Sequence, residues 1–103
     1  MFARVLDALG DEDGATHKKM FGGVCFLVRG NMACGIIGNG LIVRVGPDAY
    51  AEAMARPHTR VFDFTHRPMA GWVVVDAAGL SAPAALADWV ARGVAYARSL
   101  PAK

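Results

Sequence analysis

The sequence predicts a single α+β domain in which an antiparallel sheet of about five strands is packed by an N-terminal and a C-terminal helix. Short apolar runs between residues 24 and 45 are separated by Gly and Asn, which is typical of strands joined by tight hairpins. Apolar residues at helical spacing indicate a helix near each end of the chain. A chain of 103 residues can bury one core without disulfides or metal, so residues 1–103 are expected to form one domain.

The first predicted helix covers residues 2–9. Its apolar residues fall on one helix face: Phe2, Val5, Leu6 and Leu9. Gly10 is placed to end this helix, because Gly is the commonest residue just past a helix terminus. The acidic residues 11–13 follow in a polar loop without further ligands nearby, so they are expected to be solvated rather than to hold magnesium.

Residues 24–45 are predicted to form a three-stranded meander. The strands are the apolar runs 24–28, 32–37 and 41–45, and the turns lie at 29–31 and 38–40. Gly and Asn in these turns adopt the positive φ that tight hairpins need. An extra short strand at Lys18 to Phe21 is compatible with the pattern, with Gly22-Gly23 as a bulge or corner.

The second half is predicted to add a helix, two strands and a closing helix, which gives the order α-β-β-β-α-β-β-α. Pro47 favours the first turn of a helix that ends near Arg56, since the missing N–H is not needed there. The strands are 61–64 and 72–75, and the closing helix begins at 81–83. The predicted core comprises Phe21, Val24, Phe26, Ile36, Val43, Phe62, Trp72, Val74, Leu86, Trp89, Val90 and Val94.

No catalytic, metal-binding or cofactor pattern is complete in the sequence, so none of these sites is predicted. The three histidines, His17, His58 and His66, lack the spacing of a zinc hydrolase. The two cysteines are too far apart for a Cys-x-x-Cys zinc pair. The glycines at positions 35, 38 and 40 lie across a hairpin with no helix behind them, which argues against a dinucleotide fingerprint.

Cys25 and Cys34 are predicted to be free thiols with no redox or metal role. If Arg29-Gly30 is the hairpin loop, Cys25 lies opposite Cys34; if the loop is Gly30-Asn31, Leu27 takes that place and the thiols lie on opposite faces. Even the first register holds the Cβ atoms farther apart than in a usual disulfide. No apolar run approaches the ~20 residues of a membrane helix. A secretory signal pattern is also missing, so a cytoplasmic protein without a membrane partner is expected.

The charge distribution leaves a nucleic-acid-associated module open as an alternative. The net charge is +2, but basic residues outnumber acidic ones between residues 17 and 67. A moderate basic surface attracts phosphate backbones, although solvated charges around a sheet edge are the simpler interpretation. The candidate interaction residues are Lys18, Lys19, Arg44 and Arg67.

One block of residues is specific enough to suggest a family. It is Lys18-Lys19-Met20-Phe21-Gly22-Gly23, followed by a strand, a Gly-centred turn and Leu41-Ile42-Val43-Arg44-Val45. Further matches are Val61-Phe62-Asp63-Phe64, Pro68-Met69-Ala70-Gly71-Trp72 and the closing helix that bears Trp89. Over nearly its whole length, the chain resembles the N-terminal domain of the TfoX/Sxy family.

This resemblance implies a two-layer fold and kinship with bacterial regulators of natural competence, which act as transcriptional co-activators alongside the cyclic-AMP receptor protein. Those regulators carry a second, helical C-terminal domain, so a stand-alone N-terminal domain is expected here. The implied function is a non-enzymatic regulatory or protein-interaction module whose partner is another protein, by family analogy the transcription machinery. The motif residues are expected to be structural: Met20, Phe21, Gly22, Gly23 and Trp72. A further alternative is a small-molecule-binding domain or enzyme with a pocket between the last helix and the sheet.

Overall fold

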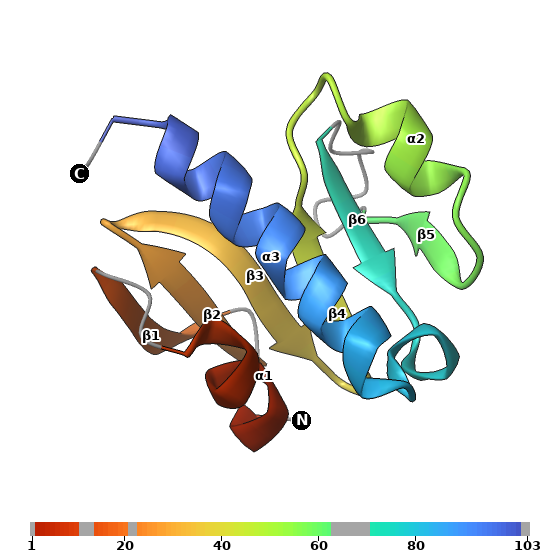
Figure 1. Ribbon diagram of the computed structural model, residues 1–103, viewed down its shortest axis with the longest axis horizontal. Helices are drawn as coiled ribbons and strands as arrows, with labels where there is room; N and C mark the ends of the chain where they lie inside the picture. Colours follow the sequence, from red (N-terminus) through yellow and green to blue (C-terminus); the bar gives the residue numbers. More distant parts are fainter. Residues whose placement is uncertain (1, 11–13, 21–22, 63–70, 102–103) are drawn as a thin grey trace.

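In this computed structural model, six strands among the described residues form one antiparallel sheet in the order β1-β2-β3-β4-β6-β5, and helices α1 and α3 lie across one face of it (Figure 1). The structure describes residues 2–10, 14–20, 23–62 and 71–101. The strands are β1 Ala15–Met20, β2 Gly23–Val28, β3 Asn31–Ile37, β4 Gly40–Arg44, β5 Thr59–Val61 and β6 Trp72–Val75. The helices are α1 Phe2–Leu9, α2 Tyr50–Met54, α3 Pro83–Ser99 and the short 3-10 helix η1 Ala77–Leu80. The predicted α+β class, with an antiparallel sheet packed by the first and last helices, is confirmed.

The meander of β2, β3 and β4 follows the predicted hairpins. Val28 pairs with Asn31, so the first loop is the two-residue turn Arg29-Gly30. Both turn residues have positive φ, 54° at Arg29 and 84° at Gly30, which matches the twist of antiparallel strands. The second loop is equally short, because Ile37 pairs with Gly40.

The sheet has one strand more than the sequence predicted. The optional short strand at 18–21 is a six-residue strand, β1, which pairs with β2 from Ala15↔Val28 to Met20↔Gly23. Four consecutive β1 residues, from Thr16 to Lys19, have exposed side chains. An edge strand of polar residues carries no apolar alternation to reveal it, while its lysines discourage pairing with another chain.

The segments after β4 also differ in their boundaries. Helix α2 covers only Tyr50–Met54, because residues 47–49 form a turn that leads into it. Strand β5 is Thr59–Val61 rather than 61–64; Phe62 follows the strand, and residues 63 and 64 lie outside the described residues. The short helix η1 was not predicted. Helix α3 begins at Pro83, as expected, with Ala82 as its N-cap.

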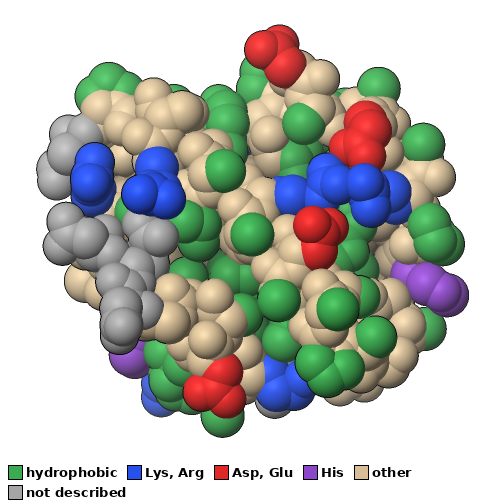
Figure 2. All heavy atoms as spheres, viewed as in Figure 1, with side chains coloured by type: hydrophobic (Ala, Val, Ile, Leu, Met, Phe, Trp, Pro, Cys, Tyr) green, Lys and Arg blue, Asp and Glu red, His purple; other side chains and the backbone are tan. Residues whose placement is uncertain are grey.

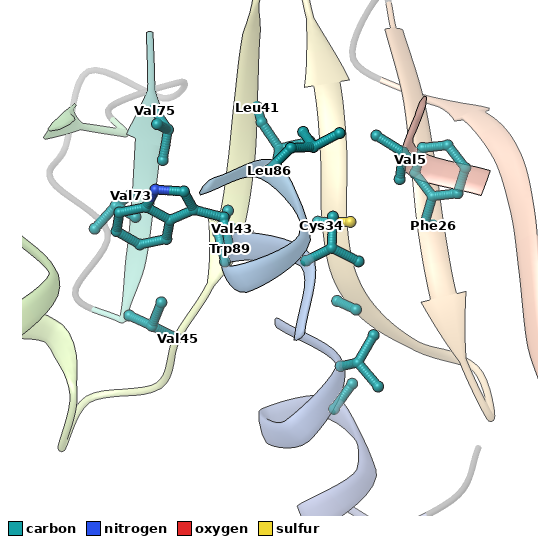
Figure 3. Packing of buried hydrophobic residues seen from close by; sticks show 14 of the residues in the cluster. Val5, Phe26, Cys34, Leu41, Val43, Val45, Val73, Val75, Leu86 and Trp89 are labelled. Carbon is teal, nitrogen blue, oxygen red and sulfur yellow. The ribbon is translucent and has the colours of Figure 1, made fainter. Parts of the chain in front are cut away.

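The main core lies between the sheet and helices α1 and α3 (Figure 3). In Figure 3 the indole ring of Trp89 projects from α3 among Val43, Val45 and Val73. Eight predicted core residues are buried: Phe26, Val43, Phe62, Val74, Leu86, Trp89, Val90 and Val94. Val24, Ile36 and Trp72 are half-buried instead, and Phe21 lies outside the described residues.

A second, smaller cluster lies on the opposite face of the sheet, which we call the second face. Its buried members are Ile42, Phe62 and Val74, with Met32, Ile37 and Trp72 partly buried around them. The sequence predicted one core, and it placed Phe62, Trp72 and Val74 in it. These three residues instead lie on the face of the sheet away from α1 and α3, because successive strand residues point to opposite faces.

A β-bulge in β3 decides where the two cysteines point. The ladder runs Phe26↔Cys34 and then Leu27↔Met32, so Ala33 has no partner on β2. The turn is therefore Arg29-Gly30, but Cys25 lies opposite Gly35 rather than Cys34. Neither of the two registers that the sequence suggested is correct, because the extra residue shifts the ladder. Cys25 and Cys34 point to opposite faces of the sheet, which prevents a disulfide between them.

Candidate functional site

Three half-buried side chains meet where β4 ends and β6 begins, and we call them the Arg44 cluster. Arg44 is the last residue of β4, and Trp72 is its direct partner at the start of β6. Tyr96 comes from the C-terminal part of α3. The guanidinium carbon of Arg44 lies over both aromatic rings, 5.0 Å from the Trp72 centroid and 5.3 Å from that of Tyr96. These distances allow cation–π attraction to both rings.

The backbone beside the cluster lets helix α3 approach the end of the sheet. The amides of Val45 and Gly46 both donate to the Gly71 carbonyl oxygen, at 2.8 and 3.0 Å, which extends the contact between the two strands beyond the Arg44–Trp72 pair to Gly71. Gly46 has φ +87°, and a Cβ on it would lie 2.4 Å from Cε1 of Tyr96. The Tyr96 ring therefore packs directly on the glycine backbone.

The charge of Arg44 is not matched by a carboxylate within the described residues. There, its N–H groups have neither a hydrogen-bond acceptor nor an acidic side chain in reach, and its guanidinium lies over the Trp72 and Tyr96 rings. Other described arginines have such partners: Arg4 donates to the Leu80 carbonyl, Arg56 pairs with Glu52, Arg60 with Asp76, and Arg92 with Asp88 and Glu52. As far as the described residues go, the Arg44 cluster thus presents a positioned cation whose N–H donors have no acceptor.

A second group of charges joins α2 to α3, and we call it the Glu52 network: Glu52, Arg56, Asp88 and Arg92. Arg92 donates to Glu52 at 2.9 Å and to Asp88 at 3.1 Å, and Arg56 contacts Glu52 at 2.8 Å. Hydrogen bonds from Arg92 and Arg56 lower the pKa of Glu52. Figure 2 shows acidic and basic side chains meeting over this region. Both arginines also lie over the Trp89 ring, so the network covers the core rather than offering free charge.

The other candidate interaction residues do not join the Arg44 cluster. Lys18 and Lys19 are exposed on the edge strand β1 and point to opposite faces. Three strand spacings separate β1 from β4, about 14 Å, so neither lysine's strand adjoins that of Arg44. Arg67 lies outside the described residues. The predicted basic surface is therefore divided among separate places on the described part of the sheet.

The family motif is described only in part. Met20 ends β1, while Phe21 and Gly22 lie outside the described residues. A Cβ on Gly23 would lie 1.8 Å from the Ile36 carbonyl oxygen, so the close approach of β3 requires glycine there. Trp72 belongs to the Arg44 cluster and contacts Phe62 with its ring, at a centroid distance of 6.1 Å.

A cleft of about 560 Å³ opens on the second face, beside the turn between β3 and β4. Its lining combines apolar side chains with the ion pair of Arg60 and Asp76, 2.8 Å apart. The alternative of a small-molecule-binding domain or enzyme expects its pocket between the last helix and the sheet, not on the second face. At Gly93 the last helix instead touches the sheet, because a Cβ there would lie 2.2 Å from the Ala33 carbonyl oxygen.

The two cysteines, Cys25 and Cys34, are buried free thiols. Burial raises the pKa of Cys34 to about 12, with a further rise from Cys25. Burial also raises the pKa of Cys25, although Lys18 partly lowers it. Among the described residues, no group of three or more His, Cys, Asp or Glu side chains could hold a metal ion. Nucleophilic chemistry at either cysteine is disfavoured because the thiolate is the reactive form.

Both thiols are expected to resist alkylation by iodoacetamide in the folded protein at neutral pH. The pKa of Cys34 is higher in the folded protein than in the unfolded chain, so the protonated thiol stabilises the folded state at any pH below the unfolded pKa of about 8.5. This stabilisation is lost as the pH rises toward the folded pKa of about 12. Protection should therefore weaken in alkali. Mass spectrometry should find two labels on the unfolded protein, one for each free cysteine, and almost none on the folded protein. Rapid labelling of the folded protein at neutral pH would contradict the burial of these residues.

The described residues thus form an α+β domain in which Arg44 lies over two aromatic rings and both cysteines are buried. The family description "TfoX N-terminal domain" matches residues 7–97. The chain therefore belongs to the TfoX N-terminal domain family. Among curated proteins and among solved structures, no match is found. No helix within the described ranges is long and apolar enough to cross a bilayer.

Proposed function

We propose that this protein is a non-enzymatic interaction module of the cytoplasm, which regulates transcription by binding another protein. The observation that carries the proposal is the Arg44 cluster. Arg, Trp and Tyr are the residues most enriched at the energetic centres of protein interfaces, and here one of each meets at a half-buried site. The resemblance to competence regulators supports the choice of process, with co-activation beside the transcription machinery as the analogous role.

The chemistry of the cluster supports binding rather than catalysis. Arginine remains protonated at physiological pH, and an indole and a phenol without an activating base do not provide a nucleophile. The cleft on the second face is lined by an ion pair and apolar groups, with no Cys, His or Ser side chain among its described lining residues. These features favour a recognition surface over an active site.

A second candidate function is association with nucleic acid, favoured by the exposed pair Lys18 and Lys19 on β1. Two lysines on an edge strand give a weak, salt-dependent attraction to phosphates. A nucleic-acid backbone is tracked by a row of cations, and Arg60 and Arg92 are already paired with carboxylates. The protein-binding role therefore has the stronger support.

Affinity capture from the native cell after cross-linking tests the proposed function. The bait should recover proteins of the transcription machinery, and this recovery should fall at least tenfold, or about 1.4 kcal/mol, for Trp72→Leu. Leucine keeps an apolar side chain beside Phe62 but removes the indole face next to Arg44. Val61→Ala is the matched control, because Val61 is an exposed apolar residue on β5 outside the cluster.

Circular dichroism should first show that both variants fold. Failure to enrich any protein that acts in transcription would refute the proposed function. Recovery that disappears after nuclease treatment would favour the nucleic-acid alternative instead.

A further inference from the structure

We propose that Arg44 is the anchor for a carboxylate in an acidic segment of the partner protein. This inference rests on the proposed function and deepens it by naming the chemistry of the partner. The segment would place an Asp or Glu side chain on the guanidinium of Arg44. A neighbouring apolar side chain of the segment would lie against the exposed parts of Trp72 and Tyr96.

The position of the guanidinium is the first argument. Its central carbon lies 5.0 and 5.3 Å from the ring centroids of Trp72 and Tyr96, so contact with two rings restricts the side chain before a ligand binds. An exposed arginine loses rotamer freedom when it binds a carboxylate, whereas an ordered one loses less of it. The cluster is therefore preorganised for an anion.

The unused donors are the second argument. A guanidinium has five N–H groups in a planar fork that matches the two oxygens of a carboxylate. Within the described residues, the N–H groups of Arg44 reach no acceptor. All three members of the cluster are half-buried, and a charge-assisted hydrogen bond is stronger in such surroundings than in open water.

The isolation of this charge is the third argument, and it favours an acidic protein segment over a nucleic acid. Arg60 lies on the same face but is neutralised by Asp76 at 2.8 Å. Lys18 lies on β1, about 14 Å away across the sheet. Among the described residues, Arg44 is a cation beside two aromatic rings with no carboxylate partner, which suits a single carboxylate with an apolar neighbour, whereas successive phosphates need successive cations.

Fluorescence anisotropy with a labelled synthetic peptide tests this proposal. The peptide alternates glutamate with leucine, and its control replaces every glutamate by glutamine. The wild-type protein should bind the acidic peptide, and Arg44→Gln should weaken binding about tenfold or more, as expected when a charge-assisted hydrogen bond is removed. Arg44→Lys should bind with intermediate affinity, because it keeps the charge but loses the planar fork. The matched control is Lys18→Gln, which removes the same charge from β1 and should change affinity less than about twofold.

Salt dependence gives a readout that a purely structural role of Arg44 would not change. The decline in affinity with ionic strength should be shallower for Arg44→Gln than for the wild type or for Lys18→Gln. Equal binding of the two peptides, or unchanged binding by a folded Arg44→Gln variant, would overturn the proposal. So would binding of a single-stranded DNA oligonucleotide at Arg44 in place of the peptide. If transcription proteins are captured from cells but the acidic peptide does not bind, this inference fails while the proposed function stands.

Discussion

Trp89→Ala is expected to lower the free energy of unfolding by about 3–5 kcal/mol. Trp89 is only 5% exposed and packs in the main core with Val43, Val45 and Val73. Alanine would leave a cavity at the centre of the contact between α3 and the sheet. It would also remove the ring over which Arg56 and Arg92 lie, at 6.0 and 5.3 Å from its centroid. Urea denaturation followed by far-UV circular dichroism measures the loss.

Two further variants serve as comparison and control for the loss of stability in Trp89→Ala. Trp89→Phe keeps an aromatic ring in the core and should lose clearly less stability than Trp89→Ala. Ala91→Ser changes an exposed residue of the same helix and should lie within about 0.5 kcal/mol of the wild type. A loss below about 1 kcal/mol for Trp89→Ala would show that the indole ring is not buried against the sheet.

The sequence predicted those helices and turns that depend on residues close together along the chain. Along α3, Leu86, Trp89 and Val90 fall at helical spacing, and all three are buried against the sheet. The Arg29-Gly30 loop formed because Gly, and here also Arg, adopts positive φ between two strands. Such features depend on neighbours along the chain, so the sequence records them directly.

The parts that could not be predicted depend on contacts between distant segments. β1 is polar along its exposed residues and exists as a strand because β2 supplies its hydrogen-bond partners. No residue type in the sequence marks the bulge at Ala33. Because of this bulge, the residue opposite Cys25 is Gly35 instead of Cys34. The second face gathers Phe62 with Ile42 and Val74, which only the strand order brings together.

The candidate site illustrates the same division. Arg44 was predicted as an interaction residue because of its charge, and Trp72 was noted as part of the family motif. Tyr96 was missed. Tyr96 follows Trp89 by seven residues, or two helical turns, so it lies on the same side of α3 as the buried Trp89. This spacing is the sequence signal that could have identified it. What joined the three residues was the pairing of β4 with β6 and the approach of α3 to Gly46, and neither is encoded in local spacing.

Gly93→Ala is expected to destabilise the protein by about 1–3 kcal/mol, the usual cost of overpacking, although Ala is the better helix former. A Cβ on Gly93 would lie 2.2 Å from the carbonyl oxygen of Ala33 and 2.9 Å from its carbonyl carbon. Those atoms belong to the backbone of the bulge in β3, so they cannot rotate away as a flexible side chain could. The helix must therefore lift from the sheet, which would loosen the packing of Trp89 and Val90 in the same core.

The control for Gly93 is the opposite exchange at an exposed position of the same helix. Ala95→Gly should also destabilise, by about 1 kcal/mol, because helix propensity alone acts there. Adding a Cβ at residue 93 and removing one at residue 95 would then shift the urea midpoint in the same direction. Propensity alone predicts opposite directions, so stabilisation by Gly93→Ala would mean that α3 does not rest on Ala33. The agreement of sign would show that contact with β3, rather than helix propensity, fixes glycine at position 93.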